Sequence, residues 1–169
     1  MNFIPNEETE KLLRSMWLGF TDNSFDAKGK AWSFTGSPYI SKVGGNSVVF
    51  DGSTTISAEN FAVNAANYSI NFTLQLAEMV GTIIETSKFT LTTSNLSSSL
   101  SLNTPTTFKI LGKANNSGVP YFEALINNTS RQAGMLQSYS TLNIKLGEGM
   151  KGFISNFSVV TDGNTISQF

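Results

Sequence analysis

The chain has 169 residues, of which 40% are apolar and only 14% are charged, and its net charge is −1. Solubility therefore depends on hydroxyl and amide groups, because roughly a third of the residues are Ser, Thr or Asn. A surface this close to neutral lacks the clustered Lys and Arg that neutralise phosphates, which argues against nucleic-acid binding. Cys and His are both absent. Their absence excludes disulfides, thiolate metal sites and a Cys nucleophile, and it removes the commonest general base.

The start of the chain predicts a short N-terminal arm, residues 1–11, ahead of a single domain over residues 12–169. The first residues are acidic and lack the basic start and apolar stretch of a Sec signal peptide. Glu7 and Lys11 would form a favourable pair on a helix, so the arm is either one short helix or a solvated lead-in to the first strand. No run of about 18 apolar residues occurs, so we expect no insertion into a membrane.

Residues 68–77 contain the clearest secondary-structure signal. Apolar side chains occupy every second position from Tyr68 to Leu76, with polar side chains between them, which predicts a strand with one apolar face. The same period recurs in weaker form, and Gly-, Asn- and Asp-rich turns interrupt it about every ten residues. We predict further strands at residues 12–20, 47–50, 54–57, 82–85, 88–93, 96–102, 106–111, 121–127, 141–146 and 152–160. Such a series predicts an all-β protein, a two-sheet antiparallel β-sandwich.

Three short motifs appear in a particular order along the chain. The opening motif is GFTDNS at 19–24 followed by GNSVVFDG at 45–52, and the closing motif is LNIKLG at 142–147 followed by MKGFISNF at 150–157. Between them, FEALINN at 122–128 has the form of a hairpin, with Asn128 where Gly is usual. Together these segments, over residues 12–160, resemble concanavalin A-like (laminin-G-like) jelly rolls, particularly those of bacteriophage virion proteins. The resemblance implies a jelly roll in which strand 152–160 lies beside strand 12–20, and Gly152 is expected to allow a close approach between strands.

The carboxylates do not show the pattern of a glycanase. Hydrolysis on this fold needs two carboxylates facing each other across a groove. Glu78, Glu85, Glu123 and Glu148 stand apart in the sequence, and none matches the Glu-x-Asp-x-x-Glu spacing of the retaining glucanases that share this fold. We therefore predict that the protein is not an enzyme and has no required cofactor.

The segment around Asp22, Asn23, Ser24 and Asp26 is the densest group of oxygen ligands in the sequence, with Asp51 as a more distant partner. Calcium prefers such carboxylate and amide oxygens, so this loop is a candidate calcium site. The alternative is a turn capped by these side chains, because Asp, Asn and Ser favour such turns without any metal.

A sugar site would combine an aromatic platform with amide and hydroxyl groups. The aromatic residues in or near loop-like segments are Trp32, Tyr39, Tyr121 and Tyr139. They are candidates for glycan contacts, and packing at the edge of the core is the alternative. Phe3 and Phe169 are expected on tails outside the sandwich, where an exposed ring would serve assembly with a partner or belong to a disordered tail.

These features predict a non-enzymatic virion protein, a phage decoration, collar, fibre or tail-associated component on the virion surface. Its expected partners are other virion proteins and further copies of itself, with glycans as additional candidate ligands. The alternative is a free-standing carbohydrate-binding lectin module, secreted or held at a cell surface without a Sec signal peptide. A hydrolase is a third hypothesis, against which the missing carboxylate pair and missing His argue.

Overall fold

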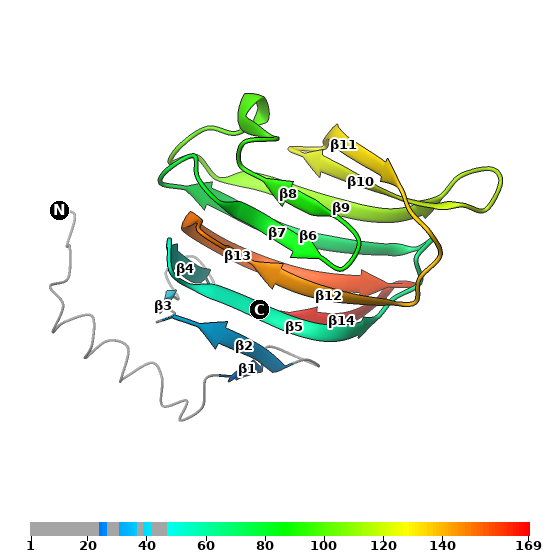
Figure 1. Cartoon of the computed structure of the whole chain (residues 1–169), viewed down its shortest axis with the longest axis horizontal. Helices are drawn as coiled ribbons and strands as arrows, with labels where there is room; N and C mark the ends of the chain where they lie inside the picture. Colours follow the sequence, from blue (N-terminus) through cyan, green and yellow to red (C-terminus); the bar gives the residue numbers. More distant parts are fainter. Residues whose placement is uncertain (1–23, 27–30, 37–38, 42–46) are drawn as a thin grey trace, which may run out of the picture.

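A computed structural model describes residues 24–26, 31–36, 39–41 and 47–169. It confirms the predicted all-β, two-sheet antiparallel sandwich (Figure 1). The predicted arm, the strand at 12–20 and the residues Phe3, Asp22 and Asn23 lie outside the described residues. No helix in the described part of the chain has the length and apolar character needed to cross a bilayer.

In the part of the chain that the structure describes, the two sheets have six and eight strands, and all their strand pairs are antiparallel. The six-stranded sheet follows the order β1 (Ser24–Asp26), β2 (Ala31–Thr35), β5 (Thr55–Ala62), β12 (Thr141–Leu146), β7 (Thr82–Thr86), β8 (Thr90–Thr92). The eight-stranded sheet follows the order β11 (Thr129–Met135), β10 (Pro120–Ile126), β9 (Thr106–Ala114), β6 (Tyr68–Leu76), β13 (Lys151–Thr161), β4 (Ser47–Asp51), β3 (Tyr39–Ser41), and β14 (Asn164–Gln168) also pairs with β13.

The alternating residues of β6 place the core between the sheets. Its five apolar residues are all buried, whereas the four polar residues between them are half-buried on the outer face. Neighbouring β9 and β10 alternate in the same way, and Phe72 of β6 stacks on Phe108 of β9 with 4.8 Å between ring centroids. A period of two therefore specifies which face of each strand is apolar, and the two apolar faces make one core.

Strand β13 lies inside the eight-stranded sheet. Its neighbours are β6 on one edge and β4 and β14 on the other. The expected partner, strand 12–20, lies outside the described residues, so its pairing with β13 stays a prediction. Gly152 does lie at a close approach, opposite Leu76 of β6, as the sequence predicted.

Two hairpins have tight two-residue turns. Asp162 and Gly163 connect β13 to β14 with φ of 47° and 78°, and Asn127 and Asn128 connect β10 to β11 with φ of 48° and 64°. Positive φ at both central positions defines a type I′ turn, which matches the twist of the flanking strands. Asn tolerates this left-handed conformation, so Asn128 can replace the usual Gly.

The predicted strand at 96–102 is wrong. A 3-10 helix, η1 (Ser97–Ser99), forms there instead, and Leu96 and Leu100 are buried on either side of it. The period of two is broken at position 98, which is Ser, while the two buried leucines are four residues apart, a spacing that suits a helical turn. The sequence also gave no strand at β11 or β14, because neither segment alternates apolar with polar residues.

The placement predicted for Phe169 is also wrong, because its ring lies in the core and only 8% of it is exposed. The ring stacks on Phe157 at 5.0 Å and meets Trp32 edge-on at 5.8 Å, and its backbone N–H donates to the Phe157 carbonyl. Burial of this apolar ring is favourable by itself, so no partner protein is needed to cover it.

Candidate functional site

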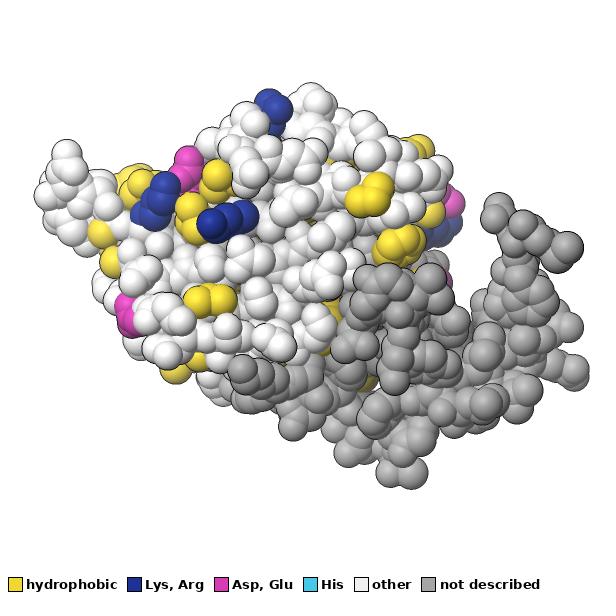
Figure 2. Space-filling model, turned by 180° about the vertical axis from the view of Figure 1, so that it is seen from behind, with side chains coloured by type: hydrophobic (Ala, Val, Ile, Leu, Met, Phe, Trp, Pro, Cys, Tyr) yellow, Lys and Arg dark blue, Asp and Glu magenta, His cyan; other side chains and the backbone are white. Residues whose placement is uncertain are grey.

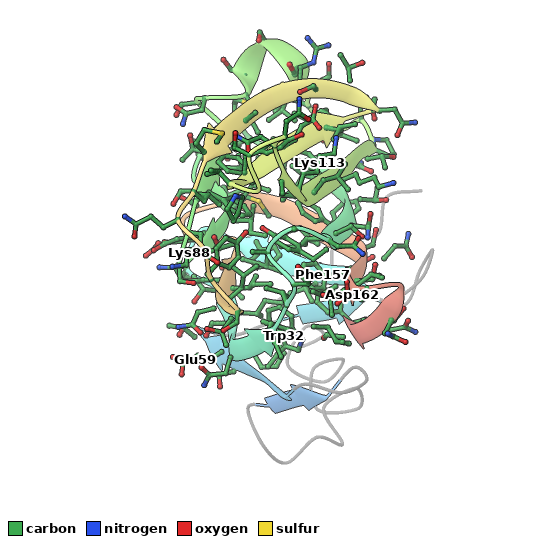
Figure 3. The ribbon with its side chains drawn as sticks, turned by 90° about the vertical axis from the view of Figure 1, so that its right-hand side faces the viewer. Trp32, Glu59, Lys88, Lys113, Phe157 and Asp162 are labelled. Carbon is green, nitrogen blue, oxygen red and sulfur yellow. The ribbon has the colours of Figure 1, made fainter. Side chains whose placement is uncertain are left out.

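A polar depression of about 350 Å³ opens on the outer face of the six-stranded sheet. We call it the sheet groove. Its residues come from three adjacent strands and the turn after β7, and they are Ser57, Ala58, Glu59, Glu85, Thr86, Ser87, Asn143, Ile144 and Lys145. Figure 3 shows Glu59 and Lys88 on this side of the molecule, Lys113 and Asp162 on the opposite side, and Trp32 and Phe157 between the sheets.

A β-bulge in β5 forms one wall of the groove. Ala58 pairs with Ile144 and Phe61 with Leu142, so two residues of β5 face a single residue of β12. The extra residue takes a left-handed conformation, with φ of 56° at Asn60. The bulge buries Phe61 one position later than strict alternation would and leaves Glu59 exposed in the groove.

Asn143 lies opposite this bulge and has a fixed orientation. Its side-chain oxygen accepts a hydrogen bond from the Asn60 N–H at 2.9 Å, and its own N–H donates to the Ser87 hydroxyl at 3.3 Å. Its carbonyl accepts from the Ser87 N–H at 3.1 Å. Because the side-chain oxygen is held, the amide NH₂ points away from Asn60, and it makes no hydrogen bond with the described residues.

The charged residues of the groove are arranged asymmetrically. The ammonium of Lys145 lies 3.0 Å from Glu85 and 2.7 Å from Glu148. The hydrogen bond to Glu148 is the main cause that raises the pKa of Lys145, and the hydrogen bond to Glu85 is the second. The hydrogen bond from Lys145 in turn lowers the pKa of Glu148. Glu59, in contrast, makes no ion pair with the described residues. Among the described residues, the ammonium of Lys145 thus pairs with two carboxylates, and the carboxylate of Glu59 pairs with none.

The aromatic residues predicted to hold a sugar are not brought together. Trp32 is completely buried, against Phe61 and Phe157, so it cannot contact a ligand. Tyr121 is half-buried in β10, within the other sheet. Tyr39 is in β3, and its side chain lies outside the described structure.

Among the candidate aromatic residues whose side chains are described, Tyr139 lies nearest to the groove in the arrangement of the strands. It precedes β12, its hydroxyl is hydrogen-bonded to that of Tyr68 at 2.8 Å, and Lys88 lies 5.3 Å from its ring centroid. Burial raises the pKa of both tyrosines, so the pair is neutral at physiological pH. Since Lys88 follows Ser87 of the groove, the half-buried Tyr139 ring lies beyond one end of the groove.

Within the described residues, no group of three or more Asp and Glu side chains is arranged to hold a metal ion. Asp26 pairs with Ala31 through its backbone, and its side chain lies outside the described structure. Asp51 has a different role, because one carboxylate oxygen accepts hydrogen bonds from the Ser53 N–H, the Ser53 hydroxyl and the Thr54 N–H at 2.9–3.0 Å. These hydrogen bonds cap the turn at Asp51. Asp22 and Asn23 lie outside the described residues, so calcium binding stays a prediction.

The capped turn predicts a pH dependence of stability. Burial alone would raise the pKa of Asp51, but the hydrogen bonds from Ser53 and Thr54 outweigh it and lower the pKa. A lowered folded-state pKa adds stability above the unfolded-state value, and this stability disappears as the pH falls through the folded-state value. We expect Asp51→Ala to have a lower free energy of unfolding than the wild type at pH 7. The difference between the two free energies should become smaller below about pH 4. Urea unfolding from pH 7 to pH 2.5 measures this difference, and a constant difference would contradict the role of the charge.

The opposite side of the molecule offers a flatter surface. Figure 2 shows it as mostly hydroxyl, amide and backbone atoms, with scattered apolar and charged side chains. A smaller hollow of about 240 Å³ lies at one end, between Lys109 of β9 and the turn residues Asp162 and Gly163. There Asp162 already accepts hydrogen bonds from the side chains of Asn64 and Asn67 at 2.9 and 3.0 Å. The sheet groove therefore presents more uncommitted polar groups.

The comparisons with known proteins give one informative likeness. No protein-family model and no curated protein matches the sequence. Among solved structures, the chain is similar to domain 4 of AbnA, an extracellular GH43 arabinanase from Geobacillus stearothermophilus, in complex with arabinotriose. The TM-score is 0.55 at 10% identity, over 82% of this chain and 84% of that chain. What the two share is the fold.

These comparisons do not support the expected link to bacteriophage virion proteins. Docking on virion proteins and self-association remain predictions from the sequence. The groove residues were missed by the sequence analysis, which did not consider Glu59 and treated Glu85 as isolated. One signal was available, because Glu59 and Asn60 place two polar residues in succession within the alternation of β5. Such a break is typical of a bulge.

Proposed function

We propose that the protein is a non-catalytic glycan-binding β-sandwich module and that the sheet groove is its binding site. The observation that carries this proposal is the set of uncommitted polar groups in the groove: the Asn143 amide NH₂, the Ser87 hydroxyl hydrogen and the Glu59 carboxylate. A sugar presents closely spaced hydroxyls that both donate and accept, so donors and acceptors on a rigid sheet suit it.

The structural likeness supports the same proposal. Domain 4 of the arabinanase was solved with arabinotriose, and its fold extends over most of this chain. Arabino-oligosaccharides are therefore the first ligands to test. The two proteins share only 10% of their residues, so the position of the site is argued here from the groove itself.

A hydrolase is the alternative that the groove raises, because Glu59 and Glu85 both line it. The general acid of a glycosidase is kept protonated by an apolar pocket or a neighbouring negative charge. Glu59 is exposed instead, and Glu85 is ion-paired with Lys145 at 3.0 Å. Neither carboxylate is buried in an apolar pocket, which supports binding without turnover.

The test is a titration of arabinan fragments by calorimetry, with variants on both faces. We expect Glu59→Ala to weaken binding about tenfold, because a hydrogen bond to a charged group contributes about 1.5–3 kcal/mol, and Ser87→Ala to weaken it a few-fold. Tyr121→Ala, on the opposite sheet, is the control and should bind as the wild type does. If Tyr121→Ala removes binding while the groove variants keep it, the site lies on the other face. Product release that Glu59→Gln abolishes would instead favour the hydrolase.

A further inference from the structure

We infer that the sheet groove selects neutral glycans over glycans that carry carboxylate, sulfate or phosphate groups, and that Glu59 is the residue that sets this preference. The inference rests on the proposed function and adds the chemical class of ligand. It is argued from the charged side chains that the structure describes around the groove.

The described side chains in and beside the groove have an excess of negative charge. Three carboxylates, Glu59, Glu85 and Glu148, lie in or beside it against the one ammonium of Lys145. The ion pairs lower the pKa of Glu148 and raise that of Lys145, so these groups keep their charges at neutral pH. Lys88, three residues after Glu85, lies over the Tyr139 ring at 5.3 Å from its centroid. The net charge of these described groups is thus −2 without Lys88 and −1 with it.

The distribution of this charge matters as much as its sum. Lys145 is engaged on two sides, so its ammonium has little capacity left for an anionic ligand. Glu59 makes no ion pair with the described residues, and its ionised carboxylate only accepts hydrogen bonds. A sugar hydroxyl can donate to such a carboxylate, whereas an anionic sugar group can only be repelled by it. The unpaired Glu59 therefore both attracts hydroxyls and excludes anions.

Coulomb's law gives the size of the expected discrimination. In water, an anion about 6 Å from one uncompensated negative charge binds roughly threefold more weakly, and from two such charges roughly tenfold more weakly. Salt screens charges that are separated by about 8 Å at physiological ionic strength. The preference for neutral glycans should therefore be largest at low salt and shrink as salt is added.

The experiment compares a neutral arabino-oligosaccharide with galacturonate oligosaccharides of equal length, at about 20 and 500 mM salt. The wild-type chain of 169 residues should bind the neutral ligand at least threefold more tightly at low salt, and the ratio of the two affinities should fall at high salt. Glu59→Gln should reduce the ratio about threefold, and Glu59→Lys should reverse it. The control is Glu123→Gln, which makes the same change in net charge on the opposite sheet, where Glu123 pairs with Lys113. It should leave the ratio unchanged.

The outcomes distinguish a failure of the charge preference from a failure of glycan binding itself. Binding of the galacturonates as tightly as the neutral ligand would overturn the charge preference and leave glycan binding intact. If Glu59→Gln and Glu123→Gln change the ratio equally, Glu59 does not set the preference. No binding of either ligand class, in a protein that unfolds cooperatively, would overturn the proposed function and the charge preference together.

Discussion

Replacing Trp32 by Ala should lower the free energy of unfolding by about 3–5 kcal/mol, the usual cost of removing a buried large aromatic side chain. Trp32 has no exposed surface and lies 5.2–5.8 Å, centroid to centroid, from Phe61, Phe157 and Phe169. The cavity would open where β2, β5, β13 and the C-terminal residue meet, so all four would lose contacts. Guanidinium unfolding measures the loss.

Trp32→Phe is the matched comparison. The indole N–H of Trp32 is buried and has no hydrogen-bond partner among the described residues, which costs about 1–3 kcal/mol in a folded protein. Phe removes this unsatisfied donor while it keeps most of the ring, so its destabilisation should be well below that of Ala. Tyr121→Ala, which truncates a half-buried ring on an outer face, should also cost much less. If Trp32→Ala left stability intact and removed glycan binding, the placement of Trp32 in the core would be wrong.

Gly152→Ala should cost about 2–5 kcal/mol, from overpacking together with backbone strain. A Cβ at this position would lie 2.3 Å from the Gln75 carbonyl oxygen and 2.9 Å from the Leu76 Cα. Both are backbone atoms of β6, so they cannot rotate away. The φ of +154° is also one that L residues rarely adopt.

Gly118→Ala separates overpacking from backbone strain as causes of the lower stability of Gly152→Ala. Gly118 has φ of +76°, yet a Cβ there would meet nothing within 4 Å. This variant therefore carries backbone strain without a clash and should cost only about 1–2 kcal/mol. The difference between the two unfolding free energies measures the close approach of β13 and β6. Equal losses would show that the strands are further apart than described.

The sequence predicted the fold well where a local pattern was sufficient. The alternation from Tyr68 to Leu76 predicted β6 and its buried face, and Gly152 marked the close approach of β13. Strands without that alternation, such as β11 at the edge of its sheet, were missed because their exposed side chains face no core. Phe169 was misplaced for a related reason: its position at the end of the chain says nothing about the packing that buries it.

The candidate site was beyond prediction because it depends on pairing between distant segments. Glu59, Glu85 and Asn143 are brought together by the register of three adjacent strands, which a single sequence does not reveal. The aromatic residues chosen from the sequence were selected for proximity to turns. Burial of Trp32 is decided by the two sheets together, so proximity to a turn was a poor guide.

The central place of β13 has a consequence for biosynthesis. Residues 151–161 pair with residues of β4 and β6 that are made about 75 to 110 residues earlier. While the ribosome is still adding the intervening residues, those two strands expose unpaired N–H and C=O groups, which can join strands of neighbouring nascent chains. Such distant pairing also makes folding slow, on the order of milliseconds to seconds. Chaperone protection during synthesis therefore matters more for this sandwich than for a protein whose neighbouring strands are consecutive in the chain.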